Sequence, residues 1–487
     1  MSALFARIVV LVSGAAILVV ETLATRLVAP YVGLTLESTT AVIGVALAGI
    51  AAGAALGGRW ADVLPPRQVA AGALLVGGLG VLGVRPLVRL LGPVLGAGPA
   101  AALLLVAAST LIAVTALAMV TPAVTRARLS DVSRAGTVVG SLSAAGTLGS
   151  LAGTFLTGFV LVTFLPVSAI LLVTAAACLL LAPVVAAARP RRATTGAVTA
   201  AVVLSLALVA VPGRCDVDTV YYCARVEIDP ARPSGRVLVL DDLRHSYVDL
   251  ADPAHLEFAY TRRFADAVDA TFPAGAPLAA VHLGGGGFTM PRWLAATRPG
   301  TRSTVLEVDR GVVELARRDL RADAIPGMEL RVGDARTTVG DLPAGSADLV
   351  VGDAFGARSV PWPLATAEFV DGMRRVLRPG GVYVLNVIDN DPRRLLAAEA
   401  ATVADRFPHV ALLVRPDQLA PGGGGNAVLV ASDHPLDLDA MEVRAAARGE
   451  PGSVLGPDAV RLLSGDADVL TDDHAPVDQL LTPYRAA

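Results

Sequence analysis

The sequence predicts an α-helical membrane domain of several spans, followed by a small β-rich region and a doubly wound α/β domain. Three observations support this order. The first 213 residues consist almost entirely of long apolar runs, and residues 214–275 carry short alternating or β-branched runs. From residue 276 onward, strand patterns alternate with helix patterns. The predicted domains are therefore 1–213, 214–275 and 276–487.

The composition fits a protein with a large membrane-embedded part. Of the 487 residues, 54% are hydrophobic and 17% are charged, a balance typical of membrane proteins. The first 213 residues hold twelve arginines and four acids, so the remainder holds 28 of the 40 basic and 39 of the 43 acidic residues. This acidic soluble part argues against nucleic-acid binding. The chain has no lysine, which excludes Schiff-base chemistry and a P-loop lysine.

Seven apolar runs in the first domain are long enough, or nearly so, to cross a bilayer of about 30 Å. They lie near residues 8–31, 38–58, 69–91, 100–122, 136–163, 165–188 and 196–212. The fifth run repeats small residues at helical spacing, which is typical of close packing against another helix. The turn Gly57–Asp62, GGRWAD, resembles a short loop of major-facilitator transporters, although seven spans are too few for that fold.

Arginines predict the orientation of these spans in a cell membrane. With a cytoplasmic N-terminus, nine arginines fall in inner segments, and the outer loops hold two, Arg85 and Arg89. Positive residues favour the cytoplasmic side, and seven spans then place residues 214–487 outside the cytoplasm. Cys215 and Cys223 lie just after the last run. They either pair in an oxidising compartment or remain two free thiols.

A glycine-rich loop, Gly284–Gly287, opens the α/β domain between a predicted strand at 278–283 and a predicted helix at 288–297. Glycines permit positive φ angles and close approach of a ligand, and the helix start offers unpaired N–H groups. A second strand is predicted at 303–308. Glu307 lies twenty residues after the loop, where nucleotide-binding folds place the carboxylate that binds ribose hydroxyls. The pattern favours a nucleoside site over a tight turn that binds nothing.

Two further acids follow predicted strands. Asp334 follows a strand at 329–332, and Asp353 follows a strand at 347–351. Because parallel strands end at the same edge of a sheet, we expect these carboxylates and Glu307 to converge on one pocket. Further elements are predicted as helices at 255–269, 310–321 and 365–377, and as a strand at 382–388.

These residues lie in motifs that resemble the spermidine synthase family of polyamine aminopropyltransferases. LDDLRHSYVDL (240–250) resembles the family's LDG…Q region, and HLEFAYTR (255–262) is similar to its EF-x-Y-x-E motif. The glycine loop, LEVD, GDA and VVGDAFG follow in family order. The whole chain is similar to bacterial membrane proteins that fuse a transmembrane domain to a spermidine-synthase-like domain. The resemblance implies a Rossmann-like fold of the S-adenosylmethionine-dependent methyltransferase type.

The resemblance also implies roles for individual residues. Gly284, Gly285, Gly286, Glu307, Asp334 and Ala335 would bind the adenosine part of decarboxylated S-adenosylmethionine, or of S-adenosylmethionine, as co-substrate. Glu307 would hold the ribose hydroxyls, and Asp334 would lie near the adenine amino group. Asp353 would accept a proton from the attacking amine, and Tyr260 would line the amine channel. No tightly bound cofactor and no metal are expected. The expected partners are the lipid bilayer, the adenosine-containing ligand and an amine, without nucleic acid.

Several positions depart from the family pattern. Gly287, Gly356 and Arg262 stand where the family has acids that help bind a cationic diamine, so we expect weak or absent activity on putrescine. Restoring an acid with Gly287→Asp is expected to improve diamine use. His245 replaces a glutamine. The tail segment with Asp472, Asp473 and His474 matches the fused relatives, and its acids either line the crevice or cap a helix.

These observations leave three functions open. The first is a membrane-bound aminopropyltransferase, which the β region and the EF-x-Y motif favour. The second is an S-adenosylmethionine-dependent methyltransferase, because the α/β core and Glu307 suit both reactions equally. The third is a non-catalytic adenosine-ligand-binding or transport-coupled membrane module, which the missing acids favour.

Overall fold

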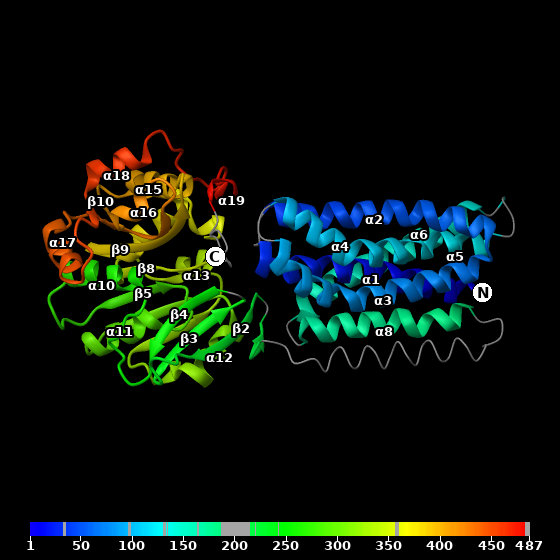
Figure 1. Cartoon of the computed structure of the whole chain (residues 1–487), viewed down its shortest axis with the longest axis horizontal. Helices are drawn as coiled ribbons and strands as arrows, with labels where there is room; N and C mark the ends of the chain where they lie inside the picture. The colour runs from blue at the N-terminus through cyan, green and yellow to red at the C-terminus, as the bar shows by residue number, and fades with distance from the viewer. Residues whose placement is uncertain are drawn as a thin grey trace. The chain divides into compact units, whose positions relative to one another are not determined.

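The computed structural model describes residues 1–32, 36–95, 99–129, 133, 135–162, 165–186, 215–219, 221–241, 243–355 and 360–482. The chain divides into two compact units, Met1–Gly213 and Arg214–Ala487 (Figure 1). The first unit is helical, and the second is built on two β-sheets.

Six helical segments of the first unit are long and apolar enough to cross a membrane, among the residues described. The helices are α1 (Ala3–Val32), α2 (Leu36–Val63), α3 (Pro66–Leu95), α4 (Pro99–Ala118), α5 (Val120–Arg128), α6 (Ala135–Leu156), η2 (Thr157–Leu161) and α8 (Val167–Ala186). Helices α4 and α5 together form one span, and α6 continues into η2. Long apolar helices are thereby confirmed at six of the seven predicted spans, whereas the run at 196–212 lies outside the described residues.

The glycines of α6 pack against α1. A Cβ atom at Gly149 would lie 2.1 Å from the carbonyl oxygen of Leu11, and one at Gly153 would lie 2.5 Å from that of Ala15. Only glycine permits such an approach of two helix backbones. The predicted packing role of the small residues is therefore confirmed.

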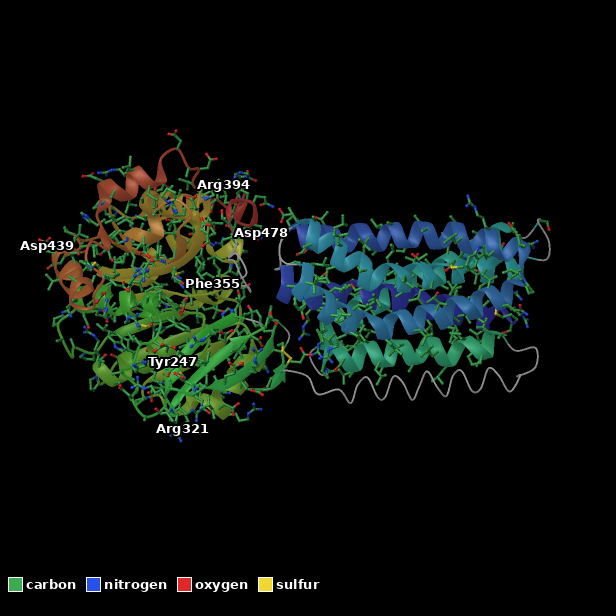
Figure 2. All side chains as sticks on the ribbon, in the orientation of Figure 1. Tyr247, Arg321, Phe355, Arg394, Asp439 and Asp478 are labelled. Carbon is green, nitrogen blue, oxygen red and sulfur yellow. A yellow bond between two sulfur atoms is a disulfide. The ribbon has the colours of Figure 1, made fainter. Side chains whose placement is uncertain are left out.

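The second unit begins with a four-stranded antiparallel sheet in the order β1-β2-β3-β4. Its strands are β1 (Val217–Asp218), β2 (Cys223–Ile228), β3 (Gly235–Leu240) and β4 (Leu243–Asp249). Cys215 and Cys223 form a disulfide, visible as the yellow bond in Figure 2, so the first of the two alternatives for these cysteines holds. The bond ties the start of this unit to β2.

The second sheet has eight strands in the order β12-β10-β11-β9-β8-β5-β6-β7. They are β5 (Ala279–Leu283), β6 (Arg302–Glu307), β7 (Met328–Val332), β8 (Ala347–Gly352), β9 (Leu377–Asn390), β10 (His409–Leu413), β11 (Gly424–Ser432) and β12 (Val454–Leu455). Strands β5 to β9 pair in parallel, and β10, β11 and β12 pair antiparallel. The strand order reverses at β5, between β6 and β8, which is where ligands bind in such sheets.

Helices cover both faces of this sheet because its central strands are apolar on both sides. Leu349 and Val351 pack with α10 (Ala259–Thr271), α11 (Thr289–Thr297) and α17 (Leu438–Ala447). Val350, between them in β8, packs on the other face with α14 (Ala367–Val376), α15 (Arg394–Arg406) and α18 (Pro457–Ser464). Helix α12 (Arg310–Leu320) packs against the small sheet. The remaining described helices are α13 (Ala335–Thr338), α16 (Pro416–Leu419) and α19 (Val477–Leu480). The 3₁₀ turns are η3 (Ala322–Ala324), η4 (Val339–Asp341) and η5 (Trp362–Leu364).

The predicted Rossmann-like, methyltransferase-type fold is confirmed. The elements predicted between residues 278 and 388 all occur, with boundaries that shift by a few residues. The largest difference is β9, which begins at Leu377 and not at residue 382. The elements after Asn390, which include β10, β11, α15 and α17, were not assigned from the sequence.

Candidate active site

A cavity of about 1030 Å³ opens at the carboxyl ends of β5, β6 and β8 in the second unit. Every site residue proposed from the sequence lines it. These residues are Tyr260, Gly284, Gly285, Gly286, Glu307, Asp334, Ala335 and Asp353. The fold therefore brings together side chains that are up to 93 positions apart in the chain.

The glycine loop and Glu307 form one end of this cavity. Gly284 and Gly286 have φ angles of +89° and +48°, which residues with a Cβ atom rarely adopt. The carboxylate of Glu307 accepts hydrogen bonds from the backbone N–H of Gly285 at 2.7 Å and of Asp309 at 2.8 Å. Burial raises the pKa of Glu307, and these hydrogen bonds oppose that rise. Glu307 thus fixes the loop and still presents lone pairs to a ligand.

Asp334 lies at the rim of the same end. It caps the N-terminus of α13, where its carboxylate accepts a hydrogen bond from the backbone N–H of Arg336 at 2.8 Å. Its side chain is exposed, and Ala335 beside it is buried. A carboxylate at this position can accept a hydrogen bond from an amino group of a ligand.

Asp353 follows β8 at the centre of the cavity and is held by two hydrogen bonds. The hydroxyl of Tyr260 donates to Oδ2 at 2.9 Å, and the amide of Asn386 donates to Oδ1 at 3.0 Å. Asn386 in turn accepts a hydrogen bond from the amide of Asn426 at 3.1 Å. Burial raises the pKa of Asp353 to about 6, although the bonds from Asn386 and Tyr260 lower it. The carboxylate is therefore oriented and poised to exchange a proton near neutral pH.

Asn386 and Asn426 were not identified from the sequence. Asn386 is 1% exposed and lies in the apolar strand β9. A polar residue in an otherwise apolar run of the predicted strand is a signal that could have identified it. Asn426 lies in β11, which pairs with β9 through the register Ile388↔Asn426.

Two of the positions that depart from the family pattern have surroundings that the sequence did not predict. At Gly287, a Cβ atom would lie 2.8 Å from the Cβ of Ser246, and Ser246 Oγ accepts the Gly287 N–H at 3.0 Å. A side chain at Gly287 would therefore require Ser246 to move, and improved diamine use in Gly287→Asp stays a prediction. Arg262 does not line the cavity, since its guanidinium donates to the carbonyls of Leu256 and Glu257. Gly356 lies outside the described residues.

His245 lines the cavity, and burial lowers its pKa to about 4, so its ring is neutral near pH 7. Its ring lies 6.1 Å from that of Tyr222.

The tail acids do not line the cavity. Asp472 accepts a hydrogen bond from Thr366, the residue that caps α14, at 2.7 Å, and forms an ion pair with Arg336. Asp473 and His474 are also absent from the lining. Of the two alternatives for this segment, the structure therefore favours a structural role at the helix terminus.

Comparisons with known proteins agree with the fold. Residues 281–385 match a family model described as a methyltransferase domain. Polyamine aminopropyltransferase 2 of Streptomyces coelicolor is 32% identical over 167 residues, which are 31% of this chain and 29% of that protein. The polyamine aminopropyltransferase of Vibrio vulnificus is 28% identical over 127 residues, which are 26% of this chain and 42% of that protein. The chain thus spans less than half the length of either relative.

One solved structure matches most of its own length. The crystal structure of a probable spermidine synthase from Corynebacterium glutamicum superposes with a TM-score of 0.50 and 28% identity, covering 54% of this chain and 97% of that one. The chain therefore has spermidine-synthase-like homologues and contains a methyltransferase-type domain. The six long apolar helices found in the described part of the chain fit a multi-pass membrane protein in which such a domain is fused to a membrane domain.

Proposed function

We propose that residues 214–487 transfer an aminopropyl group from decarboxylated S-adenosylmethionine to an amine. The observation that carries this proposal is the placement of Asp353. Its carboxylate is held by Tyr260 and Asn386 in the same cavity as the glycine loop and Glu307. The similarity to polyamine aminopropyltransferases supports the same reaction.

The proposed reaction divides the cavity into two ends. Glu307 and the glycine loop bind the ribose, and Asp334 lies at the adenine. The amine nitrogen attacks the aminopropyl carbon next to the sulfonium, so that a C–N bond forms as the C–S bond breaks. The amine gives a proton to Asp353, and 5′-methylthioadenosine leaves as a neutral thioether. Alignment of the two reactants and a positioned base supply the rate enhancement.

Two other functions are supported by particular observations. A methyltransferase is favoured by the family model at 281–385. A non-catalytic or transport-coupled binding module is favoured by Ser246, which fills the space next to Gly287 where the family has an acid.

Incubation of the purified full-length protein with each labelled sulfonium donor and a mixture of amines distinguishes the three functions. We expect labelled aminopropyl product and 5′-methylthioadenosine. Methyl transfer from S-adenosylmethionine would establish the second function instead, and donor binding without turnover of either donor would establish the third.

The pH dependence of turnover provides a further prediction. Because Asp353 must be ionised to accept a proton, and burial raises its pKa to about 6, we expect the rate to rise steeply with pH up to about 6. Above this steep limb, only deprotonation of the amine still raises the rate. Tyr260→Phe removes a hydrogen bond that stabilises the carboxylate, so this limb should move about one to two units upward. Tyr222→Phe is the matched control, because Tyr222 donates to the carbonyl of Phe355. An unshifted limb in Tyr260→Phe would contradict the assignment of Asp353 as the base.

We also propose that the N-terminus is cytoplasmic and that residues 214–487 lie outside the cytoplasm. Six spans return a chain to the side on which it began, so the side of this unit depends on whether the apolar run at 196–212 crosses the membrane. The distribution of arginines supports a cytoplasmic N-terminus, and the apolar run at 196–212 would supply the seventh crossing. The disulfide between Cys215 and Cys223 supports an oxidising compartment. S-adenosyl donors are made in the cytoplasm, so this placement requires a donor that reaches the outer side.

Fusions to the C-terminus test the orientation. Alkaline phosphatase after Ala487 is expected to be active, and a fluorescent protein at the same position is expected to remain dark. Fluorescent, phosphatase-negative cells would place the unit in the cytoplasm and would bring it to the cytoplasmic donor pool.

A further inference from the structure

One side of the cavity lies beyond Asp353, away from the glycine loop. In the sheet, β9 and β11 lie on the opposite side of β8 from β5, so their side chains face the reactant that enters opposite the nucleoside. We call this surface the acceptor wall. Its lining residues are Arg263 of α10, Asn386, Ile388 and Asn390 of β9, Arg415, Asp417 and Gln418 at α16, and Asn426 of β11.

Four residues of the acceptor wall are amides. Asn386, Asn390, Asn426 and Gln418 each carry a hydrogen-bond donor and an acceptor without net charge. They are held in place by the protein: Asn390 donates to the carbonyl of Thr482 at 2.8 Å, and Gln418 donates to the carbonyl of Gly424 at 3.2 Å. The oxygen of Gln418 accepts from Arg263 and Arg415, and its amino group donates to Gly424 and Asn426, so it serves to fix the wall. The amino groups of Asn386 and Asn390 each make one of their two hydrogen bonds to Asp353 and Thr482, so these two amides suit a ligand that both donates and accepts hydrogen bonds.

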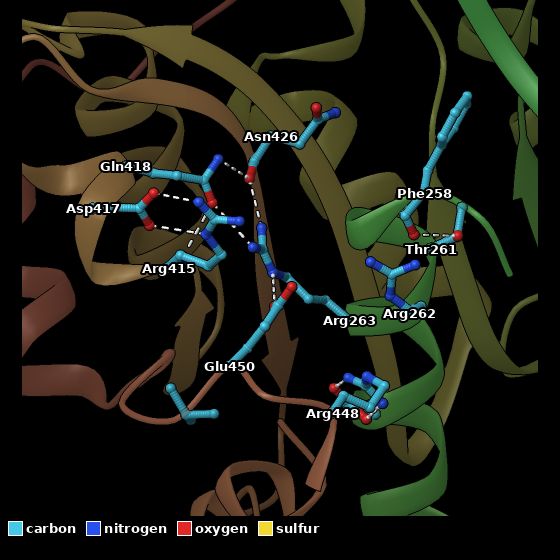
Figure 3. A network of polar contacts seen from close by, with 12 residues as sticks. Phe258, Thr261, Arg262, Arg263, Arg415, Asp417, Gln418, Asn426, Arg448 and Glu450 are labelled. Carbon is cyan, nitrogen blue, oxygen red and sulfur yellow. Dashed lines mark hydrogen bonds and ion pairs between the residues drawn. The ribbon is translucent and has the colours of Figure 1, made fainter. Parts of the chain in front are cut away.

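The charged residues of the acceptor wall form ion pairs, one with Glu450 outside the wall and one within the wall (Figure 3). Arg263 is 2% exposed and forms an ion pair with Glu450 at 3.2 Å. It also donates to the carbonyl of Asn426 at 2.7 Å. Arg415 and Asp417 form a second ion pair. The wall is therefore close to electrically neutral, and each of its charges already has an opposite partner.

The other carboxylates of the cavity are placed elsewhere. Glu307 and Asp334 lie at the nucleoside end. Glu257 is 44% exposed and lies 3.1 Å from the ring of His255, so solvent screens it. Among the residues that the structure describes, Asp353 is the one acid between the two ends, and it forms no ion pair with an arginine there. The acceptor side thus offers one carboxylate for one ammonium group.

We propose that the acceptor is a primary monoamine whose far end carries an uncharged hydrogen-bonding group such as a hydroxyl. This inference rests on the proposed function, because Asp353 is taken to receive the reacting amine. The second ammonium of a diamine would lose its hydration beside Arg263. Because the described part of the wall offers it no unpaired carboxylate in exchange, this desolvation costs free energy. A hydroxyl at the same position finds amide donors and acceptors in the wall.

Three four-carbon amines that differ only at the far end test the proposal. Putrescine carries a second ammonium, 4-aminobutanol a hydroxyl, and 4-aminobutyrate a carboxylate. Their binding to the full-length protein is measured by calorimetry in the presence of 5′-methylthioadenosine, and their turnover is measured with decarboxylated S-adenosylmethionine. We expect 4-aminobutanol to bind about tenfold more tightly than either charged analogue. Equal or tighter binding of putrescine or 4-aminobutyrate, or no binding of any of them, would overturn the proposal.

Variants at Ile388 give a matched control, because this side chain lies on the acceptor wall between Asn386 and Asn390 on the same face of β9. Ile388→Asp adds one carboxylate and should raise the affinity for putrescine relative to that for 4-aminobutanol about tenfold. Ile388→Asn adds a side chain with the shape of aspartate but without its charge, and it should leave the ratio of these two affinities unchanged. If the binding order holds but no product forms, the proposed reaction fails and the assignment of the acceptor wall stands. If product forms and putrescine is preferred, the reaction stands and this inference fails.

Discussion

Asp353→Asn is expected to lower the rate of aminopropyl transfer about 10²- to 10⁴-fold, the usual contribution of a positioned general base. The substituted amide keeps the shape of the side chain and can still accept the hydrogen bond that Tyr260 donates. It cannot take a proton from the attacking amine. Because the nucleoside end is formed by other residues, affinity for 5′-methylthioadenosine should not change.

Single-turnover rates with decarboxylated S-adenosylmethionine measure this effect, and calorimetry measures the nucleoside affinity. Glu257→Gln is the control, since Glu257 also lines the cavity but is 44% exposed and lies 3.1 Å from the ring of His255. Its turnover should stay within a few-fold of the unmodified protein. An Asp353→Asn variant that keeps more than a tenth of the activity would show that another group accepts the proton.

The three acids of the site were predictable because they follow a local rule. Glu307, Asp334 and Asp353 each stand at or just after the end of a parallel strand, and such ends meet at one edge of the sheet. Strand positions between residues 278 and 388 could be read from apolar runs alone. The convergence of these acids on one cavity therefore needed no knowledge of side-chain packing.

The acceptor wall was not predictable in the same way. Asn386 and Asn426 meet only because β11 pairs antiparallel with β9, and the sequence after Asn390 was not resolved into elements. The choice between Arg262 and Arg263 depends on the face of α10, since adjacent helical residues point in directions about 100° apart. The sequence drew attention to Arg262, but it is Arg263 that lines the cavity.

The packing of Gly287 against a residue distant in the chain was also not predictable. The absence of an acid at Gly287 suggested a space that a substitution could fill. In the structure, Ser246 comes from β4, 41 residues earlier, and lies against this glycine. The space beside Gly287 is thus filled by a side chain from the small sheet, which also lines the cavity.

Glu307→Ala is expected to weaken binding of 5′-methylthioadenosine by about ten- to a hundredfold. A hydrogen bond to a charged group contributes about 1.5–3 kcal/mol, and the variant loses the bond from the ligand's ribose hydroxyls. It also leaves the backbone N–H groups of Gly285 and Asp309 without their carboxylate partner, so the loop loses its fixed position. Both effects weaken the binding of 5′-methylthioadenosine.

Calorimetry with the full-length protein measures the effect, and two variants separate its causes. Glu307→Gln keeps one acceptor oxygen for the loop but loses the charge, so its affinity should fall between those of Glu307→Ala and the unmodified protein. Glu257→Ala removes a rim carboxylate of the same cavity that does not contact the glycine loop, and its affinity should remain unchanged. Equal affinity in Glu307→Ala and the unmodified protein would mean that the nucleoside binds without this carboxylate. The ribose would then have to be held by Asp334 and the loop alone, and the division of the cavity into a nucleoside end and an acceptor wall would have to be redrawn.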